Sequence, residues 1–131
     1  MSQAKRILIV DDDEDTLQLL KERIEELDLF SLVPTIDLAQ DGLKALPLLR
    51  EQSYDLILID YLMPKLGGLQ LIETIRNEEG KNRLTPILCL SGYLPKMDTS
   101  APSSILDKVI FLEKPFSEVK FQEATRLLLK G

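Results

Sequence analysis

Short apolar runs alternate with stretches of helical spacing along the whole sequence, and this alternation constrains the fold more than any other feature. Runs of about four to eight aliphatic and β-branched residues are typical of strands. The predicted strands are Arg6–Val10, Leu32–Ala39, Leu56–Ile59, Ile87–Leu90 and Val109–Leu112. Since helical stretches separate them, the strands should pair in parallel, in a sheet that helices cover on both faces. The first, third and fourth runs are almost wholly apolar, which fits burial on both sides.

The stretches between these runs carry their apolar residues on one helical stripe. Leu17, Leu20 and Ile24, for example, recur every three or four residues, while charged residues fall outside the stripe. The predicted helices are Asp15–Leu27, Asp41–Gln52, Leu69–Arg76 and Ser117–Leu129.

Prolines modify this pattern at three places. Pro34 lies inside the second run, where a central strand would lose a hydrogen bond, so we place this strand at a sheet edge. Pro47 lies within the second predicted helix and should kink it or delay its start. The stretch Leu94–Asp107 is rich in proline and serine, so a helix there should be short or irregular and start late, at Pro102 or Ser103.

Composition excludes several classes of function. The 131 residues suffice for one domain, and they include no histidine and one cysteine, Cys89. A histidine-based triad, a His-ligated zinc, a cysteine-cluster metal site and an internal disulfide are therefore excluded. The net charge of −6 would repel nucleic acids and anionic membranes. Since no run approaches a membrane span and no signal peptide precedes the first strand, we expect a cytoplasmic domain.

Polar side chains follow four of the predicted strands. Asp11–Asp13 follow the first strand, Asp60 the third, Ser91 the fourth and Lys114 the fifth. Each has an ordinary explanation by itself, as a helix cap, a turn residue or an exposed lysine. The carboxyl ends of parallel strands meet at one sheet edge, however, and ligands bind there. Four coincidences at one edge are less plausible than one shared site.

These side chains suit phosphoryl transfer. Capping a helix needs one acid, whereas a cluster of carboxylates is more stable around a cation such as Mg²⁺, which prefers oxygen ligands. Asp60 emerges from a buried strand and could act as a nucleophile that forms an acyl phosphate. Lys114 would supply positive charge to the phosphoryl group, and the Ser91 hydroxyl would donate to one of its oxygens. Such chemistry needs little beyond alignment and electrostatics.

Five motifs carry a resemblance to a known family. They are Ile7–Asp12, Asp55–Pro64, Gly67–Gly68, Leu90–Gly92 and Phe111–Phe116. In this order and spacing, the chain resembles the receiver domain of two-component response regulators over essentially its whole length. The resemblance implies a single receiver domain at residues 1–131. Its fold would be flavodoxin-like (βα)5, doubly wound, with a five-stranded parallel sheet in the order 2-1-3-4-5.

The resemblance also implies roles for the acidic residues. Asp60 would accept a phosphoryl group from a histidine kinase or a histidine phosphotransfer protein, which must be another chain because this one lacks histidine. Asp12 and Asp60 would ligate Mg²⁺ (or Mn²⁺) directly, Asp11 would act through water, and the Leu62 backbone carbonyl would complete the protein ligands. Asp13 is expected only to cap the first helix or to extend the acidic start of that helix.

Other positions match the residues that read the phosphoryl group in the family. Ser91 matches the switch hydroxyl, Phe111 the switch aromatic, and Lys114 the paired lysine, whose following peptide bond is commonly cis. Leu62 and Tyr93 occupy two variable positions that tune dephosphorylation. Because an apolar Leu62 cannot orient an attacking water, we predict a phosphoryl group that is not unusually short-lived.

The implied partners are the phosphodonor and a downstream protein or output domain, and a homodimer is consistent with the family. We expect no nucleic acid or membrane to bind this domain. The family's usual output and dimer surface combines the fourth helix, fifth strand and fifth helix. Here the fourth-helix segment is irregular, and Lys108–Ile110 replaces the usual Gly-Ala turn. The chain could stand alone or belong to a longer regulator or hybrid kinase.

Three alternatives compete with this interpretation. A haloacid-dehalogenase-type phosphotransferase needs a second aspartate two residues after the nucleophile, where this chain has Leu62. A dinucleotide-binding domain needs a glycine-rich turn after the first strand, where this chain has Asp11–Asp13. A receiver-like scaffold that works without phosphorylation stays open. The favoured interpretation is a signalling phosphoacceptor, which promotes its own phosphorylation and slow dephosphorylation and is not otherwise an enzyme.

Overall fold

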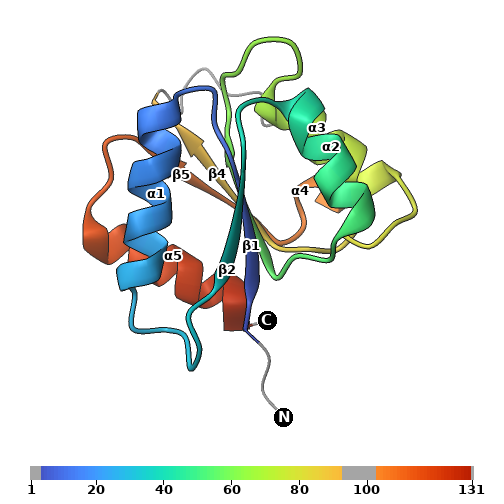
Figure 1. The fold of residues 1–131 in the computed structure, drawn as a ribbon. Coiled ribbons are helices and arrows are strands. Elements are labelled where there is room, and N and C mark those ends of the chain that lie inside the picture. Colours follow the sequence, from blue (N-terminus) through green and yellow to red (C-terminus); the bar gives the residue numbers. More distant parts are fainter. Residues whose placement is uncertain (1–3, 93–102, 131) are drawn as a thin grey trace.

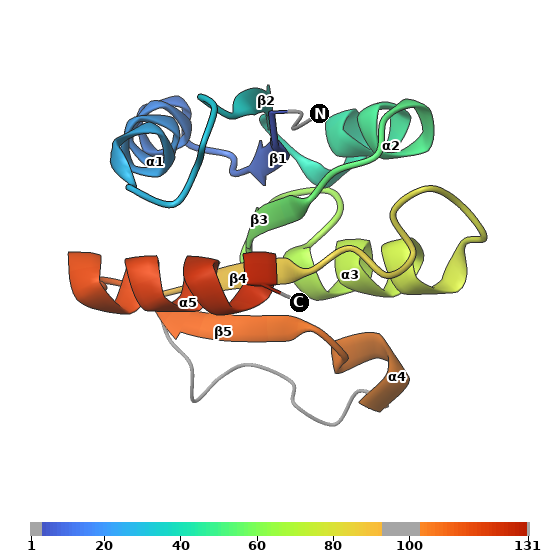
Figure 2. The same ribbon diagram turned by 90° about the horizontal axis from the view of Figure 1, so that it is seen from below.

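The computed structural model describes residues 4–92 and 103–130, and these form one parallel sheet flanked by helices (Figure 1). The strand order is β2-β1-β3-β4-β5, with every pair parallel, which confirms the predicted topology (Figure 2). The strands are β1 (Arg6–Val10), β2 (Thr35–Ala39), β3 (Leu56–Asp60), β4 (Ile87–Ser91) and β5 (Val109–Glu113). Tyr93 lies outside the described residues.

Helices cover both faces of the sheet, with α1 and α5 on one side and α2, α3 and α4 on the other (Figure 1). They are α1 (Glu14–Glu26), α2 (Gly42–Glu51), α3 (Gly68–Asn77), α4 (Ser103–Leu106) and α5 (Glu118–Lys130). Within the described residues the fourth helix covers only Ser103–Leu106, in keeping with the short helix expected there. In the part of the chain described here, no helix is long and apolar enough to cross a membrane.

Each central strand contributes side chains to two hydrophobic cores, because successive side chains point to opposite faces of the sheet. In β1, Ile7 and Ile9 pack with α1 and α5, whereas Leu8 and Val10 pack with α2, α3 and α4. All four are fully buried, as are the apolar residues of β3 and β4. This two-sided burial explains why the runs are continuously apolar and not alternating.

Two proline predictions need correction. β2 is an edge strand, as Pro34 indicated, but the strand begins after the proline, at Thr35 and not at Leu32. Pro47 does not delay α2, which starts at Gly42 and continues through the proline. The start of α2 is capped by the Asp41 carboxylate, and burial of the helix's inner face stabilises it despite the hydrogen bond that Pro47 removes.

The start of α3 packs directly on the backbone that leaves β3. A Cβ at Gly68 would lie 2.6 Å from the Asp60 carbonyl oxygen and 2.7 Å from Tyr61 Cα, so only glycine fits. The Gly68 N–H donates to the Tyr61 carbonyl at 2.9 Å. The helix therefore fixes the backbone next to Asp60.

Truncation in the sheet should be far more costly than truncation on the surface. Leu58 is fully buried in β3, so Leu58→Ala should lower the free energy of unfolding by about 2–5 kcal/mol in urea titrations. The control Leu84→Ala removes the same atoms from a side chain that is 64% exposed and should change it by less than about 0.5 kcal/mol. Equal effects of the two substitutions would contradict the described core.

Candidate functional site

The predicted site residues converge at the carboxyl edge of the sheet. Asp11 follows β1, Asp60 ends β3, Ser91 ends β4 and Lys114 follows β5. Backbone hydrogen bonds extend the sheet at this edge: the Asp11 N–H donates to the Ala39 carbonyl (3.1 Å), and the Lys114 N–H donates to the Ser91 carbonyl (2.6 Å). The functional side chains are therefore held by sheet-like backbone and not by a free loop.

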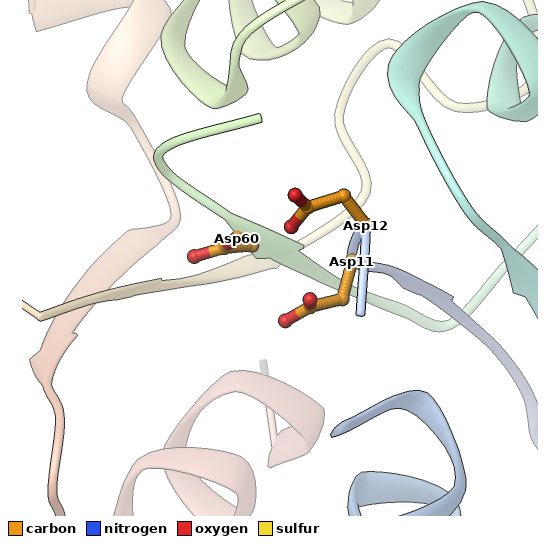
Figure 3. Close-up of side chains that lie close together, drawn as sticks. All are labelled: Asp11, Asp12 and Asp60. Atoms are coloured by element: carbon orange, nitrogen blue, oxygen red, sulfur yellow. The ribbon is translucent and has the colours of Figure 1, made fainter. Parts of the chain in front are cut away.

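Three carboxylates meet at this edge. Asp11 and Asp12 extend from the end of β1 toward the side on which Asp60 extends from β3 (Figure 3). One oxygen atom from each of the three lies within 4.8 Å of the others. Asp11 is buried, Asp60 is 12% exposed at its side chain, and Asp12 is exposed to solvent. An all-oxygen donor set with one open side fits Mg²⁺ or Mn²⁺, which keep several waters when bound.

Lys114 supplies the positive charge of the site. Its Nζ lies 3.3 Å from Asp60 Oδ1 and 3.4 Å from Asp11 Oδ2, so one ammonium group contacts two carboxylates. The peptide bond between Lys114 and Pro115 is cis, as the resemblance implied.

Burial makes the two inner carboxylates hard to ionise. It raises the pKa of Asp60 to about 6, with Lys114 opposing the shift and the charges of Asp11 and Asp12 adding to it. Burial also raises the pKa of Asp11, against the hydrogen bond from the Asp13 N–H at 2.9 Å and the charge of Lys114. A bound divalent cation would favour the ionised form of all three acids.

Asp13 stands at the start of α1, as expected, but its side chain makes no capping hydrogen bond to the helix backbone. It is the N-cap residue of α1, and its carbonyl accepts from the Leu17 N–H at 3.0 Å. Its carboxylate accepts from the Thr16 hydroxyl at 2.6 Å, a bond that lowers the pKa of Asp13. The side chain is thereby directed into the helix start, and Asp13 is not part of the carboxylate cluster.

Ser91 and Phe111 share one face of the sheet. Phe111 pairs with Cys89 in the β4–β5 ladder, and Ser91 follows Cys89 by two residues, so all three side chains point to the same face. Ser91 is buried, and Phe111 is half-buried against the core under α2, α3 and α4. The two side chains therefore lie on the same face of neighbouring strands, near the same core.

Sequence reasoning did not identify several contacts near the site. Cys89 of β4 pairs with Ile59 of β3. Burial is the main cause that raises the pKa of the Cys89 thiol to about 12, and the negative charge of Asp60 adds to the shift. Asp41 and Gly42 lie against the loop after β3, which carries the exposed Leu62. No local pattern indicates these contacts, because they join segments that are far apart in the sequence.

Comparison with known proteins identifies the family. Residues 7–126 match the response regulator receiver domain, and the chain belongs to this family. It is a receiver domain of the two-component response regulators, the class of domain that works as a phosphoacceptor switch.

Individual relatives agree with this assignment. The transcriptional regulatory protein CpxR of Escherichia coli (strain K12) is 33% identical over an alignment 133 residues long. The alignment covers 95% of this chain and 49% of CpxR. The chain thus spans about half the length of the curated relatives it matches.

Two solved structures are also similar. The Francisella response regulator 1452 receiver domain is 30% identical, with a TM-score of 0.73, covering 96% of this chain and 97% of that one. The receiver domain of the sensor histidine kinase PA1611 from Pseudomonas aeruginosa PAO1 is 25% identical, with a TM-score of 0.78 and coverage of 98% and 100%. That structure holds a magnesium ion coordinated in its active-site cleft.

The raised pKa of Asp60 predicts how stability depends on pH without metal. Because the pKa rises from 3.8 to about 6 on folding, the folded state binds more protons in that window, and stability falls as pH rises through it. Asp60→Asn removes this loss. As pH rises from about 4 to about 7, the free energy of unfolding of the variant should therefore increase relative to that of the wild type. The increase should be on the order of 1–2 kcal/mol once partial solvation is allowed for.

Urea unfolding at several pH values, with a chelator present, measures this difference. Saturating Mg²⁺ should make the difference in unfolding free energy between the variant and the wild type smaller, because Mg²⁺ binding stabilises the wild-type folded state. A difference that does not change with pH would contradict the burial cost assigned to Asp60.

Proposed function

We propose that Asp60 is the phosphoacceptor of this receiver domain and that the carboxyl edge of the sheet forms its phosphorylation site. The observation that carries the proposal is the position of the Asp60 carboxylate. It ends a central strand, lies 3.3 Å from the Lys114 ammonium group, and shares a cluster with Asp11 and Asp12. This combination supports a nucleophile with its charge-stabilising groups already in place.

In the proposed reaction, an Asp60 carboxylate oxygen attacks the phosphorus of a phosphohistidine on another protein. A phosphorus–oxygen bond forms and the bond from phosphorus to the imidazole nitrogen breaks. The imidazole leaves with the electron pair and takes up a proton, and Asp60 becomes an acyl phosphate. These 131 residues contain no histidine, so the phosphohistidine lies outside them, which fits a histidine kinase or a histidine phosphotransfer protein as the donor.

Neighbouring side chains hold the transferred group. Lys114 is placed to move its contact from the Asp60 carboxylate to a phosphoryl oxygen, and the Ser91 hydroxyl is the candidate donor to another. Asp12 and Asp60 would hold Mg²⁺ or Mn²⁺ directly, with Asp11 through water and the Leu62 carbonyl as a further ligand. When bound, the cation supplies positive charge that offsets repulsion between the acids and the phosphoryl oxygens.

Phosphorylation would be read at a distance through the shared face of β4 and β5. As Ser91 turns toward the phosphoryl group, Phe111 gains space among the residues under α3 and α4. The phosphorylated state must prefer this arrangement for the population to shift. The reading partner is a downstream protein or an output domain, in keeping with relatives that are transcriptional regulators. The acidic receiver domain itself is not the part that would bind DNA.

Incubation with acetyl phosphate and Mg²⁺ tests the acceptor assignment. Intact-mass measurement should show a gain of one phosphoryl group in the wild type. Neither Asp60→Asn nor wild type with a chelator should gain it, and Lys114→Met should react on the order of tenfold more slowly or worse. Labelling of Asp60→Asn would assign the acceptor elsewhere. If conditions that label another receiver give no adduct, the phosphorylation-independent scaffold becomes the better interpretation.

The lifetime of the phosphoryl group tests the tuning role of Leu62. Its side chain is 67% exposed and apolar, so it cannot orient a water for attack on phosphorus. The wild-type adduct should outlast the scale of seconds without a phosphatase, and Leu62→Asn should shorten its lifetime by supplying a polar group there. The decay of the adduct mass with time measures both. An adduct lost within seconds from the wild type would refute this role.

A further inference from the structure

The loop after β3, residues 61–67, lies against the start of α2. A Cβ at Gly42 would stand 2.8 Å from Leu66 Cβ and 2.9 Å from the Leu66 carbonyl oxygen, closer than real Cβ contacts come. Neither atom can move by a change of rotamer, because one is backbone and the other is fixed to it. The glycine is therefore required by the close approach of α2 to this loop.

Asp41 joins the same two segments through its charge. Its side chain is 9% exposed, Oδ1 accepts from the Lys44 N–H at 2.7 Å, and Oδ2 lies 3.7 Å from Lys65 Nζ. Lys65 has a backbone φ of 68°, in the left-handed region that residues other than glycine seldom adopt. One carboxylate thus caps α2 and pairs with the residue at which the loop turns.

The two ends of the loop are fixed as well. The Tyr61 N–H donates to the Leu90 carbonyl at 2.8 Å, and Gly68 packs on Asp60 and Tyr61 as described above. Inside the loop, Met63 and Leu66 pack against the core under α2 and α3, while Leu62 faces solvent. Contact with the start of α2 therefore adds to the core packing that supports the middle of the loop.

We propose that Asp41 and Gly42 are positioning residues for the metal site. They hold residues 61–67 so that the segment carrying the Leu62 carbonyl is set relative to Asp60 before a cation binds. This inference rests on the proposed function, because the Leu62 carbonyl matters only if the cluster takes a cation. It extends that function to two residues at the start of α2, the N-cap Asp41 and Gly42, that would contact neither the cation nor the phosphoryl group.

The physical reason is that a carbonyl ligand moves only with its backbone. Mg²⁺ demands near-ideal octahedral geometry at short distances, so a displacement of a few tenths of an ångström weakens binding. Residues that orient a ligand from outside the coordination shell typically change metal affinity by about 10–100-fold when they are mutated.

Gly42→Ala tests the inference directly, with Gly80→Ala as its matched control. A Cβ at Gly80 meets nothing within 4 Å, so the control makes the same chemical change without a contact. Amide NMR titration with Mg²⁺ should give a dissociation constant about tenfold higher for Gly42→Ala, and within about twofold of the wild type for Gly80→Ala. Thermal unfolding of each variant separates lost affinity from lost stability.

Leu66→Ala keeps the test decisive if Gly42→Ala does not fold, and Leu46→Ala is its control. Both leucines are half-buried against the same core, but only Leu66 belongs to the loop. Leu66→Ala should weaken Mg²⁺ binding several-fold more than Leu46→Ala at similar cost to stability. A merely structural role predicts equal affinity for the two.

Affinities of Gly42→Ala and Leu66→Ala equal to those of their controls would overturn the positioning role and leave the proposed function intact. A wild-type protein whose Asp11, Asp12 and Asp60 amides show no saturable response to Mg²⁺ would instead refute the proposed function. The positioning role would then fall with it.

Discussion

One ammonium group shared by two shielded carboxylates is the interaction on which the site depends. Lys114 Nζ contacts both Asp60 and Asp11, and Asp12 brings a third acid to the same place. Among the described residues, Lys114 is the one cationic side chain paired with Asp11 or Asp60, so three carboxylates there share a single positive charge and the cluster keeps an excess of negative charge. The pKa of Asp60, raised to about 6 by burial, shows that Lys114 does not fully offset the cost of removing that charge from water. The cluster therefore favours added positive charge.

The parallel sheet makes this arrangement possible, because its buried strands hold the charged groups together at one edge. The groups come from the ends of four strands, β1, β3, β4 and β5. The strands are held in register by parallel ladders, and the apolar side chains of the central strands β1, β3 and β4 are fully buried on both faces. The acids can stay close together in the folded protein because the surrounding burial stabilises the strands that carry them. Gly68 and Gly42 allow two helix starts to pack closely on the backbone around the loop beside Asp60. Gly68 packs on Asp60 and Tyr61, and Gly42 packs on Leu66.

Much of the fold and the site could be predicted because the decisive information is local. Strands β1, β3 and β4 are apolar runs, and the residues that follow them, Asp11, Asp60 and Ser91, must lie at one edge once the strands are parallel. The resemblance to receiver domains then assigned a role to each position, and the family assignment is confirmed.

What the sequence did not reveal depends on tertiary contacts. Local propensity suggested that Pro47 would disturb α2, but the Asp41 cap and the burial of Ala45 and Leu49 stabilise the helix around it. The contact between Gly42 and Leu66 joins distant segments, and no periodicity indicates it. The pKa of Asp60 likewise depends on burial and on the distance to Lys114, neither of which can be read from residue order.

A crystal structure with Mg²⁺ and beryllium fluoride bound tests the central claim most directly, because the trifluoride mimics a phosphoryl group on a carboxylate. The account predicts a beryllium atom bonded to an Asp60 oxygen, with Lys114 Nζ and the Ser91 hydroxyl contacting its fluorides. It also predicts Mg²⁺ ligated by Asp12, Asp60 and the Leu62 carbonyl. Beryllium fluoride bound to another side chain, or Mg²⁺ placed away from the three carboxylates, would contradict it.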